Sequence, residues 1–381
     1  MENTGFVLNL SETIKQNTMK KFSLICLTLL SIFISYNCKQ SIVQPNLGDI
    51  ELNLPDQVYD YHILNIRSFG GGIYHDDLKY EDGSAINNYK ATIGRVLFYD
   101  KALSINNSIA CASCHLQQNA FADNKALSQG FEEKPTLRNS MGICNLIEEA
   151  NIGYFWDSRE TKIESMVFAP IANHIEMGFE RIDLITEKIK QLPYYKQLFR
   201  NCYGDEQITA DRMRESLGHF LFSIASGKNK FDQGVSSSFS NFTAQEIRGK
   251  ELFVDNNCAR CHLLSTSFPS AYYGLKYANI GLDEKDADKG LDGVYKIPRL
   301  KNIGKTAPYM HDGRFKTLDE VLEHYSHNIQ NNPNITFPLT DAGGPVRLNF
   351  SDSEKADLVA FLKTLDDNVM TTDVKFSSPF K

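Results

Sequence analysis

Two five-residue segments of this chain each carry two thiols and an imidazole. They read Cys111-Ala112-Ser113-Cys114-His115 and Cys258-Ala259-Arg260-Cys261-His262. The pattern C-x-x-C-H is the attachment sequence for c-type haem. Two thiols at this spacing can reach the two vinyl groups of one porphyrin, and the next residue then lies under the iron as its proximal ligand. The sequence therefore predicts two covalent haems. The attachment residues are Cys111, Cys114, Cys258 and Cys261, and the proximal ligands are His115 and His262.

A single motif of this kind is also compatible with a zinc site or a thioredoxin-like redox pair. Zinc sites do not require a histidine directly after each second cysteine, and two copies in one chain favour haem. Of the other four cysteines, Cys144 and Cys202 are either buried free thiols or the partners of one disulfide. The remaining two, Cys26 and Cys38, lie near the amino terminus.

The amino-terminal segment has the organisation of an export signal. Met19 and two lysines precede an apolar run of 15 residues, 22–36, whereas a membrane span needs roughly 20. We expect residues 1–38 to be an upstream extension followed by a signal peptide. Cys38 lies where a bacterial lipoprotein carries its lipidated cysteine, and plain cleavage is the alternative. Either outcome places the chain in the periplasm or cell envelope, with residues 39–80 as a tether.

The composition excludes several classes of protein. Of 381 residues, 42% are hydrophobic and 23% are charged, which argues against disorder and provides apolar material for two domains. The net charge is −7 and there is no polybasic run, so nucleic acid is not expected as a partner. The amino-terminal run is the one apolar stretch long enough to consider for a membrane. We therefore expect membrane attachment only through a lipid on Cys38.

An internal repeat surrounds the two thiol motifs. Residues 94–100 and 249–255 are similar and precede them, and residues 135–139 and 298–302 are similar and follow them. One unit used twice predicts two small domains, each folded around one haem. Few segments alternate in polarity as strands do, so the expected fold class is mainly α.

Helix starts are visible in the second half of the chain. Thr243, Thr317 and Ser351 are each followed three residues later by Glu, which is the capping-box pattern. The helix that begins after Thr317 places five residues on one face, namely Leu318, Val321, Leu322, Tyr325 and Ile329. Residues 209–226 are predicted to form a connecting helix between the two units.

Seven ordered motifs carry a resemblance to a known family. They are GRVLFYDKALS, CASCH, KPTLRN, FWDSR, HIEMG, CARCH and TAPYMHDGRFKTLDEVL. Over residues 85–370 the chain resembles the bacterial dihaem cytochrome c peroxidases, a family that includes the MauG-type maturation enzymes. The resemblance implies two cytochrome c-like domains, which we place at residues 81–240 and 241–381. It also implies hydrogen peroxide reduction at the amino-terminal haem, electron entry through the carboxy-terminal haem, and a calcium ion between the domains.

The resemblance also implies roles for single residues. Glu176 matches the catalytic glutamate and Trp156 the indole that relays electrons between the haems. Without the motifs, Glu176 would be interpreted as an ordinary loop carboxylate and Trp156 as a core residue. His174 is close enough to Glu176 to be a rival base, although a lone histidine is more often a hydrogen-bonded loop residue. The calcium ligands would come from Asn139, Thr306 and Pro308, because hard cations prefer oxygen donors. His311 is expected to orient the second haem, and Lys301 stands where an arginine that contacts a propionate is usual.

Two positions distinguish members of this family. Peroxidases that need prior reduction have a loop histidine that caps the first iron, but here Phe131 follows Ser128-Gln129-Gly130 and residues 116–173 contain no histidine. The first haem is therefore expected to be open in the oxidised state. The distal ligand of the second haem, a methionine in the peroxidases, corresponds to Tyr325, as in MauG-type enzymes. His324, Met310 or water on the iron is the alternative.

Three functions remain open at this point. The first is an exported peroxidase that uses hydrogen peroxide and electrons from a small cytochrome or similar donor. The second is a MauG-like oxidase that modifies a protein or small molecule, because a phenolate ligand favours ferric and higher states. The third is a dihaem electron-transfer protein without catalysis, against which Glu176 and the missing capping histidine argue. A homodimer is compatible with each.

Overall fold

The fold is known from a computed structural model. It describes residues 50–62, 66–67, 74–75, 80, 82–150, 152–262, 275–283 and 292–381. The predicted signal peptide with Cys26 and Cys38 lies outside the described residues, as does much of the predicted tether. No helix in the described part of the chain is long and apolar enough to cross a membrane.

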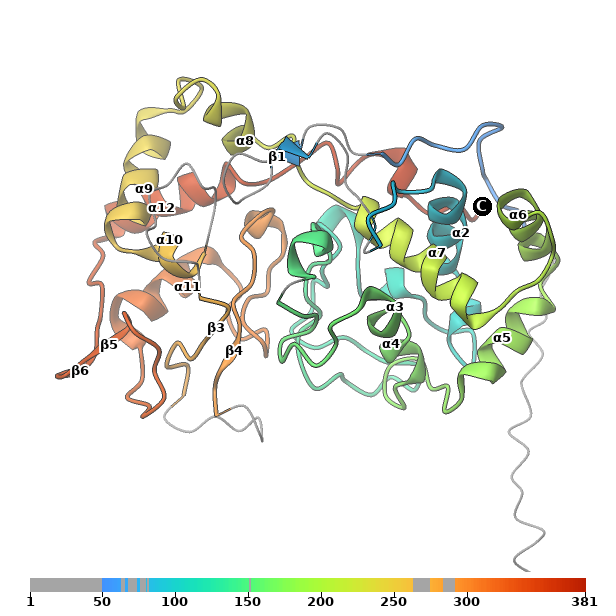
Figure 1. Cartoon of the computed structure of the whole chain (residues 1–381). Helices are drawn as coiled ribbons and strands as arrows, with labels where there is room; N and C mark the ends of the chain where they lie inside the picture. Colours follow the sequence, from blue (N-terminus) through green and yellow to red (C-terminus); the bar gives the residue numbers. More distant parts are fainter. Residues whose placement is uncertain are drawn as a thin grey trace, which may run out of the picture. The chain divides into compact units, whose positions relative to one another are not determined.

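The first core forms around a crossed pair of helices, α2 (Asn88–Tyr99) and α7 (Ala210–Ser223) (Figure 1). Gly94 permits this close crossing, because a Cβ atom there would overlap the carbonyl oxygen of Ser216. Both helices begin at side-chain caps, Asn87 and Thr209. The segment predicted as a connecting helix is thus a central core helix. Shorter helices complete this part: α3 (Ile163–Met166), α4 (Ala169–Ala172), α5 (Ile182–Lys190) and α6 (Pro193–Tyr203).

The second core repeats this arrangement with α9 (Ala244–Asp255) and α12 (Asp352–Lys363) (Figure 1). Gly249 corresponds to Gly94 in the repeat and lies against the carbonyl oxygen of Asp357 in the same way. The three predicted capping boxes are all present. The remaining helices are α8 (Lys230–Val235), α10 (Cys258–Cys261), α11 (Leu318–Glu323) and the π-helical turn η6 (His324–Asn328).

Strands are few and short in the described residues. The antiparallel pairs are β1 (Ile66–Arg67) with β2 (Tyr74–His75), β3 (Tyr277–Ala278) with β4 (Tyr295–Lys296), and β5 (Thr340–Asp341) with β6 (Gly344–Pro345). The 3₁₀ turns are Lys101–Leu103, Cys111–Ser113, Gln117–Asn119, Leu146–Glu149, Ile303–Lys305 and Val374–Phe376. The predicted mainly α class is confirmed.

The carboxy-terminal segment returns to the first core. Met370 and Phe376 are buried among the residues of that core. Arg95 donates from Nε to the carbonyl oxygen of Ser377 at 2.6 Å, and the Tyr99 hydroxyl donates to that of Phe376 at 2.6 Å. The end of the chain therefore helps to close the domain that carries the first thiol motif.

Candidate functional site

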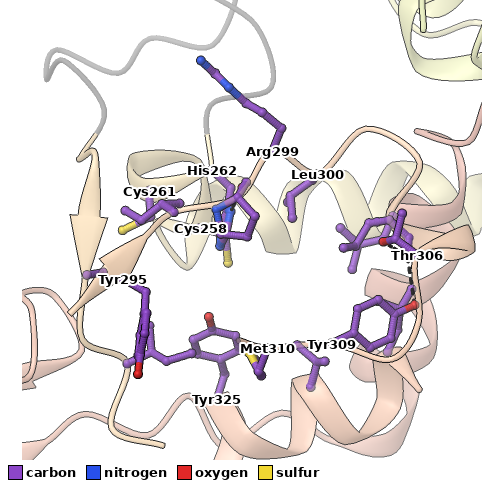
Figure 2. Close-up of a pocket in the computed structure, with 18 of the residues that line it drawn as sticks. Cys258, Cys261, His262, Tyr295, Arg299, Leu300, Thr306, Tyr309, Met310 and Tyr325 are labelled. Carbon is purple, nitrogen blue, oxygen red and sulfur yellow. Dashed lines mark hydrogen bonds between the residues drawn. The ribbon is translucent and has the colours of Figure 1, made fainter. Parts of the chain in front are cut away.

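One large cavity lies within the second core (Figure 2). Cys258, Cys261 and His262 lie on one side of it, at the short helix α10. Tyr325 lies on the opposite side, with its hydroxyl directed towards Cys258 and His262. The walls are mostly aliphatic and aromatic, and include Leu300, Leu318, Val321, Leu322, Leu348, Phe350, Leu358 and Leu362. An apolar cavity with two thiols and an imidazole on one wall fits a covalently attached porphyrin.

A second, smaller cavity lies within the first core. Cys111, Cys114 and His115 line it together with Glu176. The carboxylate thus shares a cavity with the first thiol motif, whereas His174 is exposed and does not line it. The alternative of His174 as the base is not supported by this arrangement.

Both motif histidines are oriented by a backbone carbonyl. His115 donates from Nδ1 to the carbonyl oxygen of Phe121 at 2.9 Å, and His262 donates from Nδ1 to that of Pro298 at 3.1 Å. Burial lowers the pKa of each imidazole, which keeps it neutral. A neutral ring with Nδ1 occupied presents Nε2 as a ligand, so the residues fit a haem iron.

No disulfide forms among the six cysteines of the described residues, which include Cys144 and Cys202. Of the two alternatives for Cys144 and Cys202, the free thiols are the one found. Cys144 donates to the Asn145 side chain at 2.7 Å and lines the larger cavity.

Glu176 is held by its own loop. Asn173 donates from Nδ2 to Oε1 of Glu176 at 2.9 Å, and its Oδ1 accepts from the backbone N–H of Ile175 at 2.8 Å. Burial raises the pKa of Glu176, and the positive charge of Arg159 opposes that rise. A carboxyl group with a raised pKa in a cavity is suited to accept and return a proton.

Phe131 is turned away from the smaller cavity. Its ring lies against Gly178, where a Cβ atom would be 2.6 Å from the ring, and it does not line the cavity. The backbone of this loop is fixed against the Glu176 loop, because Phe131 N–H donates to the carbonyl oxygen of Glu176 at 2.9 Å. The loop therefore brings no imidazole into the cavity.

Trp156 lines the larger cavity and is half-buried. Its Nε1 donates to the carbonyl oxygen of Asn139 at 2.9 Å. The Asn139 amide nitrogen donates to the carbonyl oxygens of Lys125 and Ala126, both at 3.1 Å, which leaves Oδ1 as its acceptor. Thr306 and Pro308 line the same cavity as Asn139. The three residues predicted to bind calcium therefore line one cavity.

The two side chains named as alternatives to Tyr325 lie in different places. His324 bonds through Nε2 to the carbonyl oxygen of Ile280 at 2.9 Å and does not line the larger cavity. Met310 does line it and lies beside Tyr325 in Figure 2. Burial raises the pKa of Tyr325, so only a strong Lewis acid would convert it to a phenolate.

Two lysines at this site have partners that the sequence did not indicate. Lys301 donates from Nζ to Asp232 and to the carbonyl oxygen of Ser226, each at 2.9 Å. Its ammonium thus bonds to two protein groups. Lys296 forms a buried ion pair with Glu149. Both pairs join segments far apart in sequence, so no local pattern could have revealed them.

Comparisons with known proteins agree with this geometry. The family model for di-haem cytochrome c peroxidase matches residues 88–238, and that for cytochrome c matches residues 247–366. The methylamine utilization protein MauG of Methylorubrum extorquens is 31% identical over 72% of this chain and 78% of its own length. The cytochrome c551 peroxidase of Nitrosomonas europaea is 28% identical over 72% of this chain and 79% of its own.

Among solved structures, a MauG-like protein associated with microbial copper homeostasis has a TM-score of 0.68 and 26% identity, over 82% of this chain and 99% of its own. The diheme peroxidase BthA of Burkholderia thailandensis, at 20% identity, shares the fold with a TM-score of 0.63, over 87% of this chain and 99% of its own. Two cytochrome c-type domains imply two c-type haems. The chain belongs to the di-haem cytochrome c peroxidase family, whose members include proteins named cytochrome c peroxidase and MauG.

Proposed function

We propose that this protein is an exported dihaem peroxidase. Hydrogen peroxide is reduced to two waters in the smaller cavity, and electrons from a small c-type cytochrome enter through the larger one. The observation that carries this proposal is the position of Glu176, which is the one carboxylate among the described residues that line the cavity of His115. An electron-transfer protein without catalysis has no use for a half-buried acid/base group there.

The protein's own residues then have distinct tasks. The haem supplies a redox-active iron that binds peroxide. Glu176, as a carboxylate, takes the proton from one peroxide oxygen and returns it to the other, so that water is the leaving group. Asn173 holds the carboxylate in place through its amide. The balance is two electrons and two further protons for each peroxide, giving two waters.

The test is the variant Glu176→Gln, which keeps the size of the side chain and removes its proton acceptor. We expect the rate of reaction with peroxide to fall by about 10²–10⁴-fold, the usual contribution of a positioned acid/base group. Stopped-flow absorbance of the oxidised protein mixed with peroxide measures this rate. Glu180→Gln is the matched control, since Glu180 is an exposed carboxylate in the same region. Native reactivity in the Glu176 variant would favour a protein that only transfers electrons.

A second candidate is a MauG-like oxidase that uses the oxidising equivalents on a protein or small molecule. The observation that favours it is Tyr325, which faces the motif residues across the larger cavity. An anionic oxygen ligand stabilises the oxidised iron and makes it a poor acceptor for electrons from a high-potential donor. Steady-state turnover with reduced cytochrome c separates the two candidates, because only the peroxidase turns over rapidly.

We also propose a calcium ion held by Oδ1 of Asn139 and the backbone carbonyls of Thr306 and Pro308. Its support is that all three line one cavity and that the Asn139 amide nitrogen is already bonded. Elemental analysis of the purified protein, before and after a chelator, tests this site.

The proposal also includes export through the signal peptide within residues 1–38 and a lipid on Cys38. The two domains are placed at residues 81–240 and 241–381. The matched family models at residues 88–238 and 247–366 support the division into domains. Intact mass of the mature protein tests the lipid, and sedimentation tests the homodimer.

A further inference from the structure

Trp156 belongs to a cluster of three rings at the edge of the larger cavity. Tyr295 stacks on His311, with ring centres 3.9 Å apart and planes 17° from parallel. The Trp156 ring meets both edge-on, 6.4 Å from Tyr295 and 6.5 Å from His311. All three line the cavity that holds the second thiol motif. Tyr295 and His311 are each 7% exposed, so solvent is largely excluded from the stack.

Tyr295 is held in this position by its neighbour in β4. Lys296 donates its backbone N–H to the carbonyl oxygen of Trp156 at 2.8 Å. The Lys296 ammonium donates to the carbonyl oxygen of Gly153 at 3.1 Å and pairs with Glu149. These contacts tie β4 to the segment that carries Trp156, independently of the ring contacts. A buried ion pair costs desolvation energy and is weak as a source of stability alone, which favours a role in fixing geometry.

The two cationic side chains near the Tyr295 ring, Arg138 and Lys296, are each paired with a carboxylate. The Arg138 guanidinium lies 5.8 Å from the centre of the Tyr295 ring and forms an ion pair with Asp157 at 2.7 Å. Lys296 is paired as well, so neither cation stands alone beside the rings. An unpaired positive charge would oppose removal of an electron from either ring.

We propose that Tyr295 is a second relay residue, which conducts electrons between the haem of the larger cavity and Trp156. This inference rests on the proposed peroxidase function. Each transfer moves one electron out of the second haem, which is oxidised, and towards the first, which is reduced. The electron tunnels through the stacked and edge-on rings without residing on Tyr295, so the Tyr295 hydroxyl keeps its proton.

The test compares Tyr295→Leu with Tyr295→Phe in the haem-loaded, half-reduced protein. After rapid mixing with one equivalent of peroxide, two rates are followed: peroxide consumption, and loss of the α band of the reduced second haem. In the leucine variant we expect the second rate to fall about tenfold or more, and in the phenylalanine variant to stay within about threefold of native. The first reaction with peroxide takes place at the other haem and precedes this transfer, so its rate serves as the internal reference for each variant. Tyr277→Leu is the matched control, because Tyr277 lies on the paired strand β3, is 40% exposed and does not line the cavity.

A purely structural role for Tyr295 gives a different result. In that case the leucine variant would shift the midpoint potential and the ferric spectrum of the second haem together with the rate. The relay predicts that both stay at their native values. A native transfer rate in the leucine variant, an equal slowing in the phenylalanine variant, or a shifted potential would each overturn the inference. A native protein that does not consume peroxide would refute the proposed function instead, so the two failures are distinguishable.

Discussion

At the scale of single residues, the chemistry depends on how the fold sets the pKa of one carboxyl group. Burial raises the pKa of Glu176, and the nearby positive charge of Arg159 lowers it. Glu176 must be a carboxylate to accept the peroxide proton, so the reaction should speed up as pH rises through this raised pKa. Arg159 therefore extends the active range towards lower pH.

The variant Arg159→Gln tests this balance. Without the guanidinium, the pKa of Glu176 rises further. The acid limb of the pH profile, over which the rate of reaction with peroxide increases with pH, should therefore move to higher pH. Stopped-flow rates measured across a pH series report the limb directly. Arg181→Gln is the control, since Arg181 is an exposed arginine paired with Asp183. An acid limb that stays in place, or moves to lower pH, would show that Arg159 does not act on Glu176.

The residues at these sites differ in how far sequence alone could identify them. The cysteines and histidines were predictable because attachment to a porphyrin needs a fixed local spacing. Glu176 was predictable only from the surrounding motifs, because a single carboxylate carries no local sign of its cavity. Tyr295 and Lys296 were missed, since their partners Trp156 and Glu149 lie more than one hundred residues away.

At the scale of elements, the turn η6 carries Tyr325, the side chain that lies opposite the second thiol motif. Sequence periodicity predicts a helix that continues to Ile329, but α11 ends at Glu323 and residues His324–Asn328 form a π-helical turn. The carbonyl oxygens of Tyr325 and Ser326 accept instead from the N–H groups of Leu348 and Asn349, at 3.1 and 3.0 Å. A distant segment has thus taken the acceptors that an α-helix would use, which no helical propensity can predict.

If Tyr325 binds the iron of the second haem, the variant Tyr325→Met should change the midpoint potential of that haem. Because a thioether stabilises the ferrous state and a phenolate the ferric state, the midpoint potential of the second haem should rise. We expect a rise of about 60 mV or more, which is a tenfold change in a one-electron equilibrium. Spectroelectrochemical titration measures it, with Tyr309→Phe as the control tyrosine on the same cavity. An unchanged midpoint potential would show that Tyr325 is not a ligand of this iron.

At the scale of the whole molecule, the repeat explains the architecture and the carboxy-terminal segment departs from it. The two helix pairs, α2 with α7 and α9 with α12, each meet at the glycine of the repeated segment. That duplication is why two helical domains could be predicted. The return of Phe376 to the first core could not, because it depends on contacts over more than two hundred and fifty residues.

Because the carboxy-terminal segment packs in the first core, we expect it to stabilise the first domain. Phe376 is 3% exposed and packs edge-on against Phe121, whose carbonyl oxygen orients His115. Phe376→Ala should lower the free energy of unfolding by about 3–5 kcal/mol through lost burial and a cavity. Val374→Ala, at a 57% exposed position, should change it by less than about 0.5 kcal/mol. Denaturant titration followed through the haem spectrum measures both, and equal effects would contradict a stabilising role for the chain end.

The central claim is that the first haem is open beneath Glu176 before any electron arrives. An electron paramagnetic resonance spectrum of the purified ferric protein, recorded before and after peroxide, tests it most directly. An open first haem predicts a high-spin ferric component that disappears on adding peroxide to the fully oxidised protein. Two low-spin, six-coordinate haems that stay inert until the protein is reduced would contradict it.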